Sequence, residues 1–234
     1  MIAVFLHIYY KESIAEIAPL LTPLKRKGVA FYINLTAPLS AADIGELELP
    51  NAVVKTSPNL GKDIGGKFLL LQQWLLLGAK EDYLIFLHDK KSPHSPLAHF
   101  WKSELFKIID STNIEIVLNH FLANSGTGIV CSKSFIRNEH ISGNEFNTTN
   151  NLRLKTLISK YNLAVNDYSF VAGTMFWCRA SSYRDFFIKH SPLSIRATLE
   201  SGNVDDFQNG TETHSWERLL SWICTSNKKK IYGI

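Results

Sequence analysis

The segment best suited to binding an anion spans Asn59–Gly66. It reads Asn-Leu-Gly-Lys-Asp-Ile-Gly-Gly, with Gly61, Gly65 and a further glycine around Lys62 and Asp63 just before a predicted helix. Glycine lets the backbone approach a ligand closely, and N–H groups at a helix N-terminus attract anionic oxygens. The segment is neither a G-x-G-x-x-G nor a Walker A sequence, so it gives little support to a dinucleotide or P-loop site. The alternative is a glycine-rich turn in which Asp63 caps the helix.

A second charged segment follows an apolar run and reads His88-Asp89-Lys90-Lys91. It would place opposite charges at the mouth of a cleft; a solvated charged turn is the alternative. Divalent metals need several oxygen or imidazole ligands. Asp89 is the only carboxylate in the segment, and the lysines would oppose a cation. Asp89 is therefore the metal ligand if a metal binds here, with His88 or His94 assisting.

Candidate acids and bases gather late in the chain, where Glu212, His214 and Glu217 open a predicted helix. His214 and Glu217 are three residues apart and can share a helix face. Acids in a first helical turn also complement the helix dipole, and Glu217 can pair with Arg218, so structural roles are the alternative. Upstream, Gly173 precedes an aromatic strand.

The elements that must position these groups alternate between strands and helices. Near-continuous apolar runs predict strands covered on both faces, and the alternation predicts a mainly parallel α/β sheet with right-handed crossovers. The first strands are expected at Ile2–Tyr9, Val29–Leu35, Ala52–Thr56 and Tyr83–Leu87. The first helices are expected at Glu12–Lys27, with a kink or break at Pro19 and Pro23, and at about Gly65–Gly78, which is apolar nearly all round and reads as a core helix.

The second half of the chain continues the pattern without a linker or repeat. Helices are expected near His99–Ile109, Asn113–Ala123, Leu152–Tyr161, Ser182–His190 and Glu212–Cys224, and strands near Gly128–Cys131, Thr174–Arg179 and Lys230–Ile234. Asn138–Asn151 and Ser201–Thr211 are expected to be irregular. We predict a single domain over 1–234, with a nucleotide-binding half (1–96) and a half that completes the site (97–234).

Ligands of open parallel sheets bind at the carboxyl ends of the strands. The four predicted N-terminal strands end near His7 and Tyr9, Asn34 and Thr36, Asn59, and His88 to Lys91. This rim therefore collects aromatics, amides, a carboxylate and lysines. That assortment suits a polyanion with a flat base.

Composition limits the class of protein. Of 234 residues, 45% are hydrophobic and 20% charged, and the net charge is +4. These values indicate a globular protein and exclude a multi-span membrane protein, and the charge is too mild to indicate nucleic-acid binding. No apolar stretch approaches the ~20 residues of a membrane-crossing helix. The start lacks the features of a signal peptide, so a cytoplasmic location is expected. The widely spaced Cys131, Cys178 and Cys224 are expected to be buried or free thiols.

Four segments together resemble the rhamnan-synthesis F-like glycosyltransferases of bacterial surface polysaccharide assembly. They are Asn59-x-Gly61-Lys62-Asp63-Ile64-Gly65-Gly66, Leu87-His88-Asp89-Lys90-Lys91-Ser92, Gly173-Thr174-Met175-Phe176-Trp177 and His214-x-x-Glu217-Arg218. The resemblance implies a GT-A-like (Rossmann-like) fold. It also implies a UDP- or dTDP-sugar donor, a growing glycan or polyprenyl-linked acceptor, and a role in cell-envelope polysaccharide or O-antigen synthesis. A divalent metal, Mn²⁺ or Mg²⁺, commonly assists such enzymes, but here one carboxylate of the usual Asp-x-Asp motif is missing.

The resemblance assigns roles to the residues already singled out. Donor binding is expected from His7, Tyr9, Asn34, Asn59, Gly61, Lys62, Asp63, Gly65, His88, Asp89, Lys90 and Lys91. Acceptor binding is expected from Gly173, Thr174, Trp177 and Trp216. Glu217 ranks first as the base, ahead of His214 and Glu212, and the late-helix position favours an inverting reaction.

Two other functions fit the sequence less well. One is a non-catalytic nucleotide- or glycan-binding module of the same fold. The other is a different phosphate-chemistry enzyme, which would ordinarily need a metal cluster or an activated nucleophile. Basic runs at Lys25-Arg26-Lys27 and Lys228-Lys229-Lys230 suit peripheral association with the inner face of the plasma membrane, and ordinary solvated surface charge is the alternative.

Overall fold

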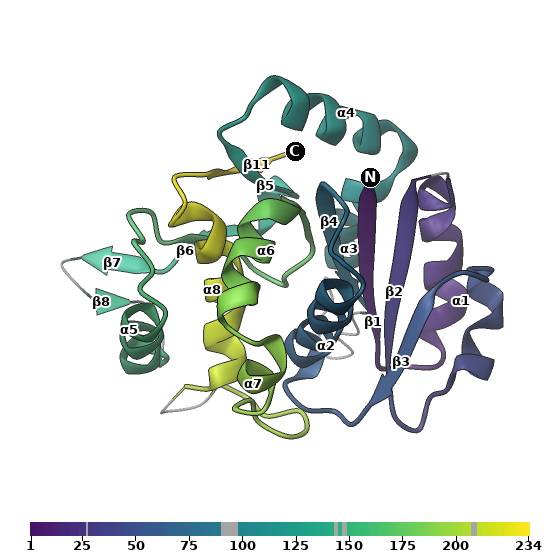
Figure 1. Cartoon of the computed structure of the whole chain (residues 1–234), viewed down its shortest axis with the longest axis horizontal. Helices are drawn as coiled ribbons and strands as arrows, with labels where there is room; N and C mark the ends of the chain where they lie inside the picture. Colours follow the sequence, from purple (N-terminus) through teal and green to yellow (C-terminus); the bar gives the residue numbers. More distant parts are fainter. Residues whose placement is uncertain (27, 90–97, 143–144, 147–148, 207–209) are drawn as a thin grey trace.

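The apolar runs form a central seven-stranded sheet. A computed structural model describes residues 1–26, 28–89, 98–142, 145–146, 149–206 and 210–234. The strand order is β11-β5-β10-β4-β1-β2-β3 (Figure 1). The strands are β1 Ile2–Ile8, β2 Val29–Thr36, β3 Val53–Ser57, β4 Tyr83–His88, β5 Thr127–Cys131, β10 Phe176–Arg179 and β11 Lys230–Gly233.

The sheet is mainly parallel, as predicted. β1 pairs in parallel with β2 and β4, and β2 pairs in parallel with β3, so the carboxyl ends of all four strands share one rim. β10 runs antiparallel to both β4 and β5, and β11 is parallel to β5. The second half of the chain therefore extends the sheet of the first half, and the molecule is a single mixed α/β domain.

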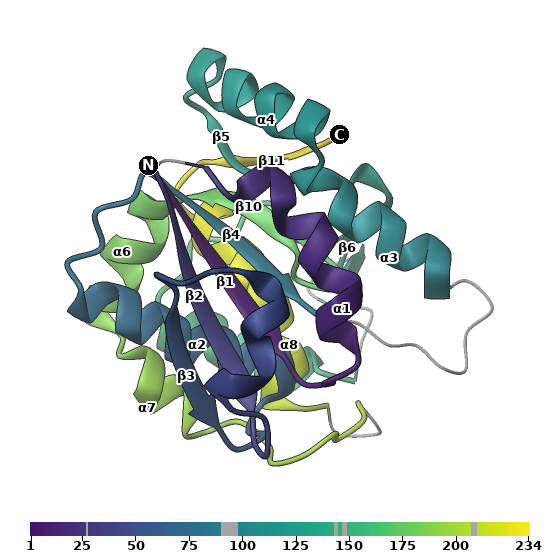
Figure 2. The ribbon, with the colours of Figure 1, turned by 90° about the vertical axis from the view of Figure 1, so that its right-hand side faces the viewer.

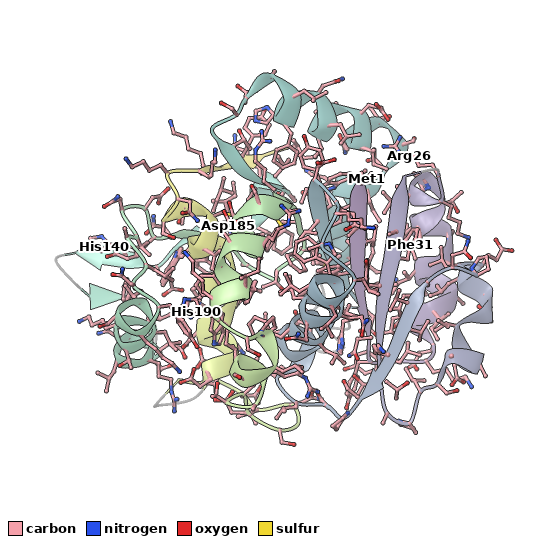
Figure 3. All side chains as sticks on the ribbon, in the orientation of Figure 1. Met1, Arg26, Phe31, His140, Asp185 and His190 are labelled. Carbon is pink, nitrogen blue, oxygen red and sulfur yellow. The ribbon has the colours of Figure 1, made fainter. Side chains whose placement is uncertain are left out.

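Helices cover both faces of the sheet (Figures 1 and 2). α2, α6 and α8 lie on one face, and α1 and α3 lie on the other. The helices are α1 Ser13–Ile17, α2 Lys62–Leu76, α3 Ala98–Phe106, α4 Ser111–Ala123, α5 Asn151–Lys160, α6 Ala180–Lys189, α7 Pro192–Arg196 and α8 Glu212–Thr225. Side chains fill the layers between helices and sheet (Figure 3), and four tryptophans, Trp74, Trp177, Trp216 and Trp222, are fully buried.

Local sequence accounts for the breaks between elements. The predicted helix at 12–27 is interrupted as the prolines require, since α1 passes at Ala18 into a 3₁₀ helix that ends at Leu24. The predicted irregular segment at 138–151 contains the short strands β7 His140–Ser142 and β8 Glu145–Phe146. Two further short strands, β6 Ile136–Asn138 and β9 Ser169–Val171, pair with each other. A 3₁₀ helix at Ala41–Leu47 and helix α7 were not predicted.

Two further predictions concern the state of the cysteines and the presence of a membrane-crossing helix. Cys131, Cys178 and Cys224 are buried free thiols. Burial raises the pKa of Cys131 and Cys224 to about 12, so neither is activated as a nucleophile. Across the described parts of the chain, no helix has both the length and the apolar composition needed to cross a bilayer.

Gly65 is required for close packing at the start of α2. A Cβ atom there would lie 1.7 Å from the backbone oxygen of Leu60, which cannot move without shifting the preceding turn. We expect Gly65→Ala to lower the free energy of unfolding by roughly 1–3 kcal/mol, the usual cost of overpacking. Urea unfolding of both proteins measures the difference. Gly45→Ala is the matched control, because nothing lies within 4 Å of its Cβ position; equal effects of the two substitutions would contradict this account.

Candidate active site

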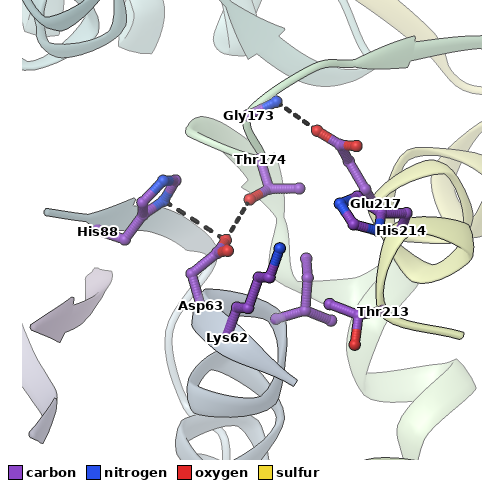
Figure 4. A pocket seen from close by; sticks show the side chains of 9 residues that line it. Lys62, Asp63, His88, Gly173, Thr174, Thr213, His214 and Glu217 are labelled. Carbon is purple, nitrogen blue, oxygen red and sulfur yellow. Dashed lines mark hydrogen bonds and ion pairs between the residues drawn. The ribbon is translucent and has the colours of Figure 1, made fainter. Parts of the chain in front are cut away.

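A pocket opens at the carboxyl end of β4, between the N-terminal ends of α2 and α8 (Figure 4). The described residues that line it are Lys62, Asp63, Ile64, His88, Gly173, Thr174, Thr213, His214 and Glu217. All four segments that the sequence singled out therefore contribute to one cavity. Its volume of about 120 Å³ is below the ~300–1,000 Å³ of whole-ligand pockets, so it fits part of a ligand, such as a phosphate group.

The segment from Arg196 to Gly202 holds the starts of both helices. The Arg196 side chain donates to the carbonyls of Gly65 (3.1 Å) and Pro58 (3.0 Å), and the Gly61 N–H donates to the Glu200 carbonyl (2.7 Å). The Glu200 carboxylate accepts hydrogen bonds from the N–H groups of residues 212 and 213, at 2.7 and 3.0 Å. One short segment thereby fixes the spacing between α2 and α8, on which the pocket depends.

The backbone has a left-handed conformation at Gly61 and Lys62, where the chain enters α2 beside the pocket. Gly61 has φ +75° and Lys62 has φ +51°. Positive φ is ordinary for glycine and uncommon for lysine, and such strained residues often occur at functional sites. The Lys62 side chain projects among the pocket residues (Figure 4).

A buried ion pair lies directly below the pocket. Lys67 Nζ lies 2.6 Å from Asp63 Oδ2, and the Lys67 side chain is fully buried. Lys67 also donates to Thr174 Oγ1 and lies 3.3 Å from His88 Nδ1. Burial alone would raise the pKa of the Asp63 carboxyl, but Lys67 and then His88 outweigh it and hold the pKa well below its ordinary value. Asp63 is therefore a fixed negative charge neutralised by Lys67.

The turn before β10 forms the opposite wall. Gly173 and Thr174 have φ +77° and +50°, a second pair of left-handed residues. The Thr174 hydroxyl donates to Asp63 Oδ2 (2.8 Å), and the Gly173 N–H donates to Glu217 Oε1 (2.7 Å). These bonds connect the turn to α2 on one side and to α8 on the other, and they stabilise a conformation that a β-branched threonine rarely adopts.

The two leading candidate bases share the α8 wall, as their spacing predicted. Glu217 Oε2 accepts a hydrogen bond from Arg218 (2.5 Å), which also donates to buried Glu139 (2.8 Å). His214 Nδ1 lies 2.6 Å from Thr211 Oγ1. Burial lowers the pKa of His214, Asp206 opposes the shift and Lys62 adds to it, so the imidazole is neutral near pH 7.

Glu212, the third candidate base, does not line the pocket. Its carboxylate lies 3.3 Å from the guanidinium of Arg153, in α5. Glu212 and His214 thus diverge although they are only two residues apart, because adjacent positions on a helix point in different directions.

Two predicted donor-binding residues lie below the rim. His7 and Asn34 are 3% and 0% exposed. Ser57 Oγ donates to Asn34 Oδ1 (3.1 Å), and Asn34 Nδ2 lies 2.9 Å from His7 Nδ1. Burial lowers the pKa of His7 to about 4, against the nearby Asp63. The structure therefore corrects their assignment: they connect the ends of β1, β2 and β3 and are not exposed to a ligand.

Two other predicted donor-binding residues, Asn59 and Tyr9, are partly buried at the rim. Asn59 Nδ2 donates to Asn203 Oδ1 (3.1 Å), and Asn203 Nδ2 lies 3.5 Å from the Tyr9 hydroxyl. Asn203 carries no distinguishing sequence signal beyond its Gly/Asn/Asp-rich surroundings. Lys90 and Lys91 lie outside the described residues.

Among the described residues, the carboxylates proposed to bind a metal are already engaged by other groups, and His94 lies outside the described residues. Asp89 Oδ2 accepts hydrogen bonds from the backbone N–H groups of Tyr9 (2.8 Å) and Tyr10 (2.6 Å), and Asp63 is engaged by Lys67. Within the described ranges, no group of three or more His, Cys, Asp or Glu residues is arranged to hold an ion. Burial raises the pKa of Asp89 to about 6, although the two backbone hydrogen bonds lower it. The same two bonds connect the Asp89 carboxylate to the turn after β1.

Two predicted acceptor-binding residues are corrected as well. Trp177 and Trp216 are fully buried. Trp177 Nε1 donates to the Ile108 carbonyl (2.9 Å), and the Trp216 ring packs edge-on against Phe68 at 5.0 Å. Both belong to the core, whereas Gly173 and Thr174 do line the pocket. Lys67 and Thr213 were not predicted as site residues; the i, i+4 spacing of Asp63 and Lys67 was the available signal for Lys67.

Asp89 makes the stability depend on pH. Its pKa is about 6 in the folded protein and 3.8 as an unperturbed group. Its contribution to stability is therefore fully present below pH 4 and is lost as pH rises through 6, by about 3 kcal/mol. We expect the difference in unfolding free energy between the native protein and Asp89→Asn to fall by this order between pH 4 and 7. Histidines that titrate in this range affect both proteins and cancel in the difference. A pH-independent difference in urea unfolding would contradict the prediction.

Comparison with known proteins identifies a family for this chain. A family model described as rhamnan synthesis protein F matches residues 1–229. A search of curated proteins finds no match. The family match spans all the segments that meet at the pocket and nearly the whole chain. The protein belongs to the rhamnan synthesis protein F family.

Proposed function

We propose that the protein is a GT-A-type glycosyltransferase. It transfers a sugar from a UDP- or dTDP-sugar to a growing bacterial surface polysaccharide or a lipid-linked glycan. Membership of a family of rhamnan polysaccharide synthesis supports a role in making such a polymer. The observation that carries the proposal is the pocket itself, which joins the cationic Lys62 side chain and two candidate bases, Glu217 and the neutral His214, at the carboxyl rim of a parallel sheet.

The order of the segments also supports the donor site. In the GT-A arrangement implied by the resemblance, a Gly/Asn-rich segment precedes the strand whose end holds the donor diphosphate. Here Asn59–Gly66 precedes β4, and His88 at the end of β4 lines the pocket. Lys62 supplies positive charge in the same cavity, where a departing nucleoside diphosphate develops negative charge.

The reaction that we propose is a single displacement with inversion. The acceptor hydroxyl oxygen forms a bond to the anomeric carbon while the bond from that carbon to the diphosphate oxygen breaks. The hydroxyl proton passes to the base, and the nucleoside diphosphate leaves with the bonding electrons. Lys62 and His88 face the departing diphosphate, and Glu217 and His214 face the acceptor side.

Glu217 remains our first choice for the base, and the geometry defines its rival. Its carboxylate is held by Gly173 and Arg218, which orients it but also occupies both oxygens. His214 is neutral near pH 7 and can accept a proton. The two residues line the same wall, so only variants separate them.

Transfer assays with a panel of nucleotide sugars test the proposed activity, and variants test the base. If Glu217 accepts the proton, Glu217→Gln lowers the turnover rate by ~10²- to 10⁴-fold while donor affinity changes little. Glu212→Gln is the matched control, since that carboxylate pairs with Arg153 outside the pocket. Turnover rate, donor affinity and melting temperature are measured for each variant.

Two other outcomes would change the assignment of the base or of the activity. A folded Glu217→Gln protein with near-normal turnover at saturating substrates removes Glu217 from the mechanism; a large defect in His214→Ala then moves the assignment to His214. Binding of a nucleotide sugar without turnover across the panel supports a non-catalytic binding module.

We also propose that the protein works at the inner face of the plasma membrane. One described residue from each basic run contacts α4 or the residues just after it: Arg26 pairs with Glu115 of α4 (2.8 Å), and Lys229 Nζ donates to the Ser125 carbonyl (2.9 Å). Figure 3 shows Arg26 on the side of the molecule where α4 lies. Each basic residue near an anionic bilayer adds ~1 kcal/mol of attraction.

Flotation with anionic liposomes tests this surface. We expect binding at low salt that weakens at high salt, and weaker binding when exposed Lys228 and Lys230 are both replaced by alanine. Lys80→Ala with Lys189→Ala is the matched control, because it removes the same charge from exposed positions elsewhere. Equal flotation of the two double variants, or no flotation at either salt concentration, would contradict the proposal.

A further inference from the structure

A single guanidinium serves two carboxylates beside the pocket. Arg218 Nε donates to Glu139 Oε1 (2.8 Å), and Arg218 Nη1 donates to Glu217 Oε2 (2.5 Å) and to the His214 carbonyl (3.1 Å). The guanidinium also lies over the Phe170 ring, 4.5 Å from the ring centroid. These contacts hold Arg218 in place, so the two carboxylates share one fixed positive charge.

Glu139 reaches Arg218 from a distant part of the chain. It lies between β6 and β7, and its N–H donates to the Tyr168 carbonyl (3.2 Å) beside the pairing of β6 with β9. β9 is joined to α8 by the Val171 N–H, which donates to Ser221 Oγ (3.0 Å). The paired strands β6 and β9 therefore place the Glu139 carboxylate against α8.

The charges of this group do not balance. The Glu139 side chain is 4% exposed, and its Oε2 is buried without a hydrogen-bond partner within the described structure. A buried carboxylate is costly unless a counter-charge compensates it, so Glu139 needs Arg218. Two negative charges and one positive charge leave an excess negative charge, and like charges raise the affinity of a carboxylate for a proton. Glu217, with a side chain 21% exposed in the pocket, is the carboxylate that a substrate can reach.

We propose that Glu139 is a positioning residue that keeps Glu217 competent as a base. If Arg218 paired with Glu217 alone, its full positive charge would favour the ionised carboxylate and weaken it as a proton acceptor. Because Glu139 takes part of that charge, Arg218 orients Glu217 without suppressing its basicity. The inference rests on the proposed function, in which Glu217 accepts the proton of the acceptor hydroxyl.

Other charged and titratable groups also face Glu217. Those that line the same pocket in the described structure are Lys62 and Asp63 of α2, His88 of β4 and His214 of α8. Asp206, in the segment before α8, lies 3.9 Å from His214 Nδ1, and the turn at Gly173 and Thr174 adds no titratable group. Lys62 acts in the opposite sense to Glu139, and Lys67 neutralises Asp63. All of these groups remain when Glu139 is replaced, so the replacement measures the effect of the Glu139 charge.

Carboxyl ¹³C NMR of the intact labelled protein, without substrate, tests the inference. Glu139→Gln keeps an oxygen acceptor for Arg218 Nε but removes the negative charge. We expect the titration midpoint of the Glu217 carboxyl to fall by roughly one pH unit, the order expected for two charges that share a partner near a protein surface. Glu139→Asp keeps the charge and should restore most of the native midpoint. Glu104→Gln is the matched control, because its carboxylate pairs with Lys107 and does not line the pocket; it should leave the midpoint unchanged.

The same coupling can be measured in the reverse direction. Coupling between two sites is reciprocal, so Glu217→Gln should lower the titration midpoint of the Glu139 carboxyl by the same amount. This measurement leaves the buried Glu139 position unaltered, and it decides the question if Glu139→Gln does not fold. A midpoint that stays at the native value or rises in the folded variants overturns the inference.

Transfer assays separate the inference from the proposed activity. Glu139→Gln should lower the turnover rate by roughly threefold, as for a general base that has lost this much strength, with an unchanged KM for the donor. The acid limb of its pH profile should move to lower pH together with the NMR midpoint. A lower melting temperature without displacement of that limb identifies a structural ion pair and overturns the inference. A native protein whose midpoints are coupled as expected, but which transfers no sugar from any donor, supports the coupling and contradicts the proposed function.

Discussion

The buried ammonium of Lys67 is the constraint on which the site depends. A charge removed from water is costly unless a counter-charge and hydrogen bonds compensate it. Asp63, one helical turn earlier, supplies the counter-charge, and Thr174 supplies a further partner. Because these partners come from α2 and from the turn before β10, satisfying one buried lysine fixes the relative positions of two walls of the pocket.

The wall of the pocket formed by α8 is also held by a buried charged group and its hydrogen bonds. Arg218 lies between the carboxylates of Glu139 and Glu217, and Glu217 in turn holds the Gly173 N–H. Each link contains a charged group and a short hydrogen bond, the stronger kind in proteins. A rigid polar frame of this kind costs stability, and its value lies in holding reactive groups in fixed geometry before a ligand arrives.

The sequence predicted the layout of the sheet well because buried strands are continuous apolar runs, and it predicted the break after α1 from two prolines. It placed the start of α2 near Gly65, three residues late, because glycines suggest a loop. Here Gly65 is needed for contact with the Leu60 carbonyl. α7 has only five residues and lacked a periodic pattern to reveal it. Trp177 was assigned to the acceptor because it belongs to the segment Gly173–Trp177 that resembles the family, and only three-dimensional packing shows that it is buried.

The antiparallel pairing of β4 with β10, here called the seam, joins the two halves of the chain and limits where the chain can be divided. β4 ends the first half of the chain, and β10 from the second half covers its edge, with Leu84, Ile85 and Phe86 fully buried. A fragment that stops after the first half would expose this apolar strand edge, the kind of surface that pairs with other molecules and aggregates. The halves are therefore not exchangeable modules: a chimera between relatives needs both sides of the seam from the same parent.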